Sequence, residues 1–246
     1  AGEFGAKHDK EKLELWLNTP GARLDSIVTD HSIMWYIREQ TKDDIKLLIE
    51  EYVDYVVEMK KWRPSLKVGI IESLGYFEVQ GKDKIYSQSS KGLPELEFGS
   101  FVKQLLAEAK RKKVTIDFFD VDFGFRGVTN DSRKGDQSGS TKWDWRTGPY
   151  DYGRILAVEE ICRDLKLDCG IIFNDTIDIE MLKKRGFNST EEADSEWGNR
   201  AVKYIKEYIA SGGNPDRVIF QSWTANPTTT GPETKENSFL GITKRQ

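Results

Sequence analysis

The stretch Lys67-Val-Gly-Ile-Ile-Glu72 places an uninterrupted apolar run between two charged residues. A strand with one face in water would alternate apolar and polar side chains, so this run predicts a strand that is buried on both faces. Strands of this kind belong to parallel sheets that are covered by helices. The stretch therefore indicates an α/β fold.

Similar apolar runs recur along the chain and are separated by longer amphipathic segments. The other expected strands are Ser26–Asp30, Val114–Asp120, Cys169–Asn174 and Arg217–Trp223. The clearest expected helix covers Asp43–Trp62, where Thr41 can cap the start and Pro64 follows the end. Further helices are expected over Lys10–Asn18, Phe98–Arg111, Tyr152–Leu165 and Ser195–Ala210, with a short one after Lys235.

Alternation of strands and helices leaves two architectures, a doubly wound sheet or a barrel. The sequence has no Gly-rich phosphate turn between a first strand and helix, so we favour a parallel (β/α) barrel of TIM type. Such a barrel needs eight strands, and five are counted here. We therefore expect a barrel that is incomplete or truncated at its N-terminus, with a partner chain as one way to complete it. Residues 1–8 are expected to be a cloning scar or linker, and residues 9–246 a single barrel-like domain.

The composition excludes several classes of partner. The formal net charge is -4 and the basic runs are short, so nucleic acid is not an expected ligand. No stretch approaches the roughly 20 apolar residues that cross a bilayer, and the first residues lack the apolar core of a signal peptide. Cys162 and Cys169 fall on an expected helix and the next strand, where either a disulfide or two buried thiols would fit.

Acidic and amide side chains follow the expected strands, at the end where barrel active sites lie. They are Asp30 with His31, then Glu72, then Asp120 with Asp122, then Asn174 with Asp175, and finally Gln221 with Trp223. Asp120 and Asp122 alternate with Val121 and should share one face. We expect Glu72, Asp122 and Asp175 to be catalytic and the others to bind substrate. The alternative is that Glu72 is a structural acid in a salt bridge and that the aspartates hold a cation or loop amides.

Aromatic residues beside these strand ends indicate the class of ligand. Trp35, Tyr76, Trp143, Trp145 and Trp223 follow the expected strands or lie in the long polar segment after the third. Flat rings around a polar cup suit sugars, whose C–H faces stack while their hydroxyls bond to acids and amides. Core packing under long loops is the alternative for several of them. No metal ligand set and no cofactor is expected, because a lone histidine gives poor support for zinc.

The order of these strand ends resembles the clan of TIM-barrel glycoside hydrolases. In that clan the fourth strand carries the acid/base, the seventh the nucleophile, and the eighth often ends in tryptophan. Taken as strands four to eight, the chain puts Asp30-His31 at the first place, Asn174-Asp175 at the second and Trp223 at the third. His31 stands where the resemblance implies the acid/base glutamate, and Asp175 is shorter than the glutamate that it implies.

These observations predict a glycoside hydrolase-like protein that acts on a polysaccharide or oligosaccharide through paired carboxylates. An extracellular or cell-surface location is expected for such a protein. Retaining and inverting mechanisms both remain open, since adjacent strand ends allow either carboxylate spacing. The alternatives are a carbohydrate-binding barrel without catalysis, suggested by His31, and a metal-dependent barrel enzyme that uses Asp120 and Asp122.

Overall fold

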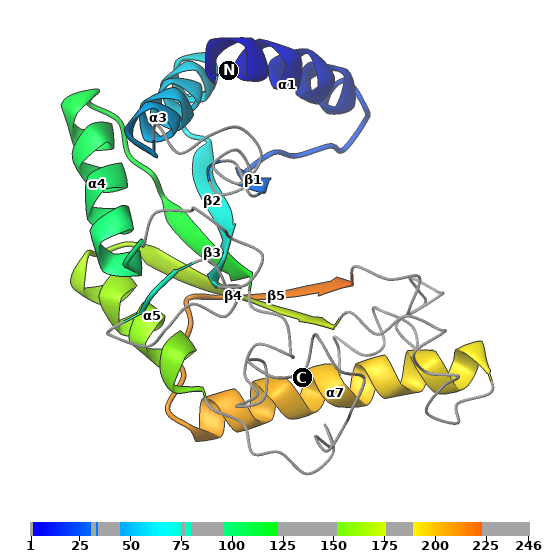
Figure 1. Ribbon diagram of the computed structural model, residues 1–246. Helices are drawn as coiled ribbons and strands as arrows, with labels where there is room; N and C mark the ends of the chain where they lie inside the picture. Colours follow the sequence, from blue (N-terminus) through cyan, green and yellow to red (C-terminus); the bar gives the residue numbers. More distant parts are fainter. Residues whose placement is uncertain are drawn as a thin grey trace. The chain divides into compact units, whose positions relative to one another are not determined.

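A computed structural model describes residues 2–30, 33, 45–74, 77–79, 96–122, 152–175 and 189–222 (Figure 1). The chain divides into two compact units, which are described separately. The first contains Ala1–Val121 and Ala157–Gly170, and the second contains Asp122–Leu156 and Ile171–Gln246. The predicted helix after Lys235 lies outside the described residues.

The strands confirm the α/β class and the five predicted strand positions. They are β1 (Ser26–Asp30), β2 (Lys67–Ser73), β3 (Phe118–Asp122), β4 (Asp168–Asp175) and β5 (Arg217–Ser222). They form a parallel sheet in the order β1-β2-β3-β4-β5. As the apolar run predicted, every residue of β2 after Lys67 is buried.

The third strand begins later than predicted, at Phe118 rather than Val114. The hydrogen bonds of Asp117 explain the delay. The Asp117 carboxylate accepts the Val68 N–H at 2.7 Å and the Lys60 ammonium at 2.6 Å. The side chain of Asp117 thus takes part in the sheet's hydrogen bonding before the regular strand starts.

Helices α1 (Gly2–Leu17) and α3 (Ile45–Trp62) pack together in the first unit. The segment that was expected to be a linker is helical from Gly2 and buries Ala6. The Tyr55 hydroxyl of α3 donates to Asp9 of α1 at 2.9 Å. In the part of the chain that the structure describes, no helix combines the length and the apolar character needed to span a bilayer.

Helix α4 (Phe98–Arg111) matches its predicted bounds and packs through aromatic rings. Phe98 and Phe101 contact Phe119 of β3 edge-to-face, with ring centroids 5.2 and 6.4 Å apart. Phe119 therefore points toward α4. Phe118, the next residue back along the strand, points to the opposite face, where its ring covers Gly69 of β2.

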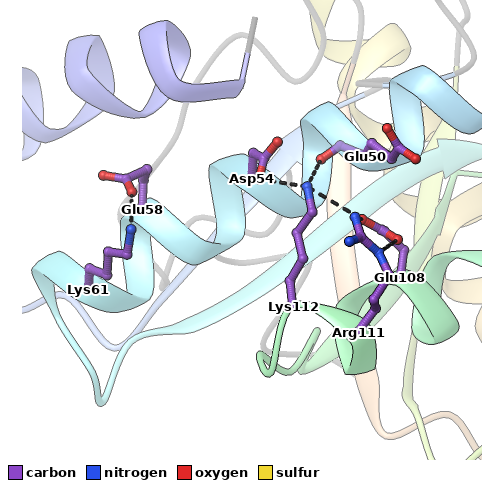
Figure 2. A network of polar contacts seen from close by, with 7 residues as sticks. All are labelled: Glu50, Asp54, Glu58, Lys61, Glu108, Arg111 and Lys112. Atoms are coloured by element: carbon purple, nitrogen blue, oxygen red, sulfur yellow. Dashed lines mark hydrogen bonds and ion pairs between the residues drawn. The ribbon is translucent and has the colours of Figure 1, made fainter.

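Ion pairs join α3 to α4 on their exposed sides (Figure 2). Lys112, the residue after α4, donates to the Asp54 carboxylate at 2.6 Å and the Glu50 carbonyl at 3.1 Å. Glu108 accepts from Arg111 through both carboxylate oxygens and lies 3.4 Å from the Lys112 ammonium. Networks of this kind add modest stability and fix how the two helices meet.

The second unit is centred on α7 (Thr190–Ala210), which begins five residues before the predicted Ser195. The Ser189 hydroxyl caps the helix by accepting the Glu192 N–H at 3.2 Å. This S-x-x-E sequence is a capping box and was the missed signal. Tyr204 of α7 packs against Phe173 of β4 with ring centroids 4.6 Å apart. Helix α5 (Gly153–Asp164), which begins in this unit, lies close to its predicted bounds.

Replacing Gly69 with alanine should destabilise the fold by about 1–3 kcal/mol, because the added Cβ would overlap the Phe118 ring. Urea unfolding measures the loss. The control is Gly5→Ala in α1, where the nearest atom to the new Cβ is Tyr55 Cδ2 at 3.9 Å. That change should be neutral or stabilising, since alanine favours helix. Equal stability of the two variants would contradict the assigned face of Phe118.

Acid should weaken the link between α3 and α4. Hydrogen bonding from Arg111 is the main reason that the pKa of Glu108 lies below its ordinary 4.5. A carboxylate with a lowered folded-state pKa stabilises the fold above its unfolded pKa, and this contribution disappears as pH falls through the lowered value. Glu108→Gln should therefore cost about 0.5–1 kcal/mol at pH 7 and less at pH 3. Urea unfolding at both pH values tests this, with exposed Glu11→Gln as control.

Candidate functional site

The predicted site residues fall into three groups in the structure. Asp30, Glu72, Asp120, Asp122 and Gln221 are described with their side chains. Asn174 and Asp175 are the last two residues of β4. The remaining candidates, His31, Trp35, Tyr76, Trp143, Trp145 and Trp223, lie outside the described residues.

Glu72 lies near the end of β2 on the face that α3 covers. Thr29 of β1 pairs with Ile70 of β2, so these two side chains share a face, and Glu72, two residues further, shares it too. Tyr52 of α3 lies on the same side, because its pKa responds to both Thr29 and Glu72. Glu72 is 0% exposed. Its carboxylate is therefore placed between the sheet and a helix.

The Glu72 carboxylate holds the backbone just beyond β1. Its Oε1 atom accepts the N–H of buried Ile33 at 2.8 Å. Burial raises the pKa of Tyr52 far above 10, the Thr29 hydroxyl acts in the opposite direction, and the negative charge of Glu72 adds to the rise. Tyr52 therefore stays protonated beside the carboxylate. The contacts describe a residue that positions the segment after β1.

Asp120 lies on the other face of the sheet. Phe119 points toward α4, so alternation along β3 turns Asp120 away from the helices. Asp122 has the same parity as Asp120, as the sequence predicted. Asp120 is 1% exposed, whereas Asp122 is half-buried.

Asp30 and Asp120 lie on this same face, with β2 between them. Asp30 pairs with Ile71 in the β1–β2 register. The Phe118 ring covers Gly69 on this face, and Asp120, two residues further along β3, lies on the same face. The two aspartates thus belong to the strands on either side of β2, which are roughly 10 Å apart, twice the spacing of neighbouring strands.

Asp30 and its strand are open to solvent on this face. Asp30 is exposed, and Val28, which shares its parity, is 38% exposed. Ser73 at the end of β2 also shares this parity and is a buried polar residue that the sequence reasoning missed. The face on which Ser73 lies can be assigned only from the β1–β2 register. The face therefore carries two carboxylates and a hydroxyl, which come from β1, β3 and β2.

In the second unit, Asp122 lies close enough to Tyr204 to influence it. Burial is the main reason that the pKa of Tyr204 is raised well above 10, and the charge of Asp122 adds to it. Gln221 in β5 is half-buried. Among the residues that the structure describes, no group of three or more histidine, cysteine or acidic side chains could hold a metal ion.

Removing the Glu72 carboxylate should loosen the backbone at Ile33. Glu72→Ala leaves a buried N–H without its acceptor, which costs about 1–3 kcal/mol. Glu72→Gln keeps an oxygen that can accept the bond and should cost less. Urea unfolding and amide hydrogen exchange at Ile33 measure both effects. An Ile33 amide that stays protected in Glu72→Ala would show that the bond does not hold this segment.

Comparison with models of protein families, with curated proteins and with solved structures finds no match for this chain. The function is therefore argued from the residues of the chain itself. What they offer is a pair of aspartates on one face of a parallel sheet, one at the end of β1 and one in the middle of β3.

Proposed function

We propose that this chain is a glycoside hydrolase-like protein with a TIM-type barrel, which acts on a polysaccharide through Asp30 and Asp120. The observation that carries the proposal is the placement of these two carboxylates on one face, on the strands that flank β2. Strand ends of parallel barrels are where active sites form. The aromatic residues of the sequence near the strand ends supply the sugar-stacking surfaces.

Carboxyl spacing distinguishes the two glycosidase mechanisms. Inverting glycosidases hold their carboxyl groups roughly 6.5–9.5 Å apart, which leaves room for a water molecule, whereas retaining enzymes hold them about 5–5.5 Å apart. We propose inversion for this pair, because one of its two carboxylates lies in solvent, where the attacking water can bind beside it. Asp30 is exposed and meets water, so it is the base that activates the nucleophile. Asp120, which is buried, is the acid that protonates the leaving oxygen.

The other predicted site residues take supporting roles in this proposal. Glu72 positions the segment after β1 through the Ile33 N–H and does not itself contact the sugar. Asp122, Asn174, Asp175 and Gln221 belong to the second unit, where they are proposed to bind sugar hydroxyls. Action outside the cell or at its surface would match a polysaccharide substrate.

The test is a panel of soluble glycans assayed with the wild type, Asp30→Asn and Asp120→Asn. Each variant should lower kcat by about 10²–10⁴-fold while glycan binding is retained, because amides cannot transfer the proton. Glu72→Gln is the matched control and should keep most activity at a temperature where it is folded. NMR of the first product should show an inverted anomeric centre.

Three outcomes would overturn the proposal. Loss of activity in Glu72→Gln with full activity in both aspartate variants would move the chemistry to the other face. Binding of a glycan without cleavage would make the chain a carbohydrate-binding barrel. Activity that a chelator removes and a divalent ion restores would indicate a metal-dependent enzyme.

A further inference from the structure

A hollow lined by four lysines lies at the opposite end of the first unit's strands. Its volume is about 570 Å³, within the range of small-ligand sites. The four are Lys60, Lys110, Lys113 and Lys166, and no carboxylate is among the lining residues. The chain as a whole carries a net charge of -4, so this is a local reversal of sign.

Three of the four ammonium groups are available to a ligand. Lys60 donates to the Asp117 carboxylate at 2.6 Å and the Thr115 hydroxyl at 3.3 Å. Lys110, Lys113 and Lys166 are exposed and form no ion pair with any residue that the structure describes. Like charges that gather without acidic partners repel one another, and a bound anion relieves that repulsion.

Helix-end electrostatics accounts for two of the four lysines. Lys60 and Lys110 lie in the last turns of α3 and α4, where a cation suits the helix dipole. Lys113 and Lys166 lie two residues beyond α4 and α5, with φ of 60° and 57°. Glycine is the residue that this left-handed backbone favours. The same C-terminal turn after two helices thus brings two lysines to one hollow.

The floor of the hollow is aliphatic. Pro64, Leu106, Val114 and Ile116 line it between the lysines. A ligand that matches this surface has several negative charges and also an apolar face. A sugar ring that carries carboxylate or sulfate groups has both properties, because its C–H face packs on aliphatic side chains while its anionic groups meet ammonium groups.

We propose that the hollow binds an acidic saccharide. It is a second glycan site, which lies before the amino ends of β2 and β3 and is separate from Asp30 and Asp120. This inference rests on the proposed function for its choice of sugar. It implies that the polysaccharide on which the protein acts is anionic. The lysines then bind one part of the polysaccharide, and the carboxylates Asp30 and Asp120 act on another part.

The test measures binding by calorimetry to four probes. Trigalacturonate carries carboxylates, sucrose octasulfate carries sulfates, maltotriose is neutral, and tripolyphosphate has charge without a sugar. The hollow variant is Lys110→Gln, Lys113→Gly and Lys166→Gly, in which glycine suits the left-handed backbone and should preserve stability. The control, Lys7→Gln, Lys12→Gln and Lys103→Gln, removes three exposed charges elsewhere.

The wild type should bind at least one acidic saccharide, and the hollow variant should bind it about tenfold more weakly, since three ion contacts are lost. The control should change affinity less than twofold or so. The acidic saccharide that binds shows whether the hollow recognises carboxylate or sulfate groups. Absence of binding to both, equal loss in the control, or tripolyphosphate binding as tightly would overturn the inference.

Cleavage separates this inference from the proposed function. If a neutral glycan is cleaved and no acidic saccharide binds, the assignment of the hollow is overturned and the proposed function stands. If an acidic saccharide binds in the hollow and no glycan is cleaved, the inference is supported and the proposed function fails. If the wild type cleaves a short soluble substrate, the hollow variant should cleave it at the same rate.

Discussion

The packing of the Phe118 ring on Gly69 decides which way the side chains of β2 and β3 point. A strand has only two faces, so one such contact sets the direction of every other residue along it. With Phe118 over Gly69, Phe119 faces the aromatic rings of α4 and Glu72 faces α3. A slip of one residue would reverse all of these contacts and bury Asp120 under a helix.

This alternation separates two acidic residues that look alike in the sequence. Glu72 and Asp120 both follow apolar runs near strand ends, and both are almost fully buried. Glu72 accepts a backbone N–H on the helix side, a role that needs an oxygen and no access for substrate. Asp120 lies on the same face as Asp30, which is exposed, although Asp120 itself is 1% exposed. One acidic residue therefore supports the fold on one face, and another serves the proposed chemistry on the other face.

The two ends of β2 and β3 also differ in charge. Carboxylates lie at the carboxyl ends, where strands of a parallel sheet present their βα connections. At the amino ends, lysines follow the helices that precede β3 and β4. Lys60 spans α3 and the start of β3 through Asp117, and it thereby contributes to the fold as well as to the hollow. The proposed catalytic and binding roles make use of this polarity of the strands.

The sequence by itself determined the class of fold, the order of the elements and the bounds of α4 and β1, because apolar periodicity and caps act over a few neighbouring residues. It missed the capping box at Ser189 and placed the start of β3 four residues early, where the Asp117 carboxylate replaces regular strand pairing. The pairing of Asp30 with Asp120, and the gathering of Lys113 with Lys166, were decided by tertiary structure alone. Both depend on strand register and on which face each side chain takes, and these are set by contacts between residues far apart in the chain.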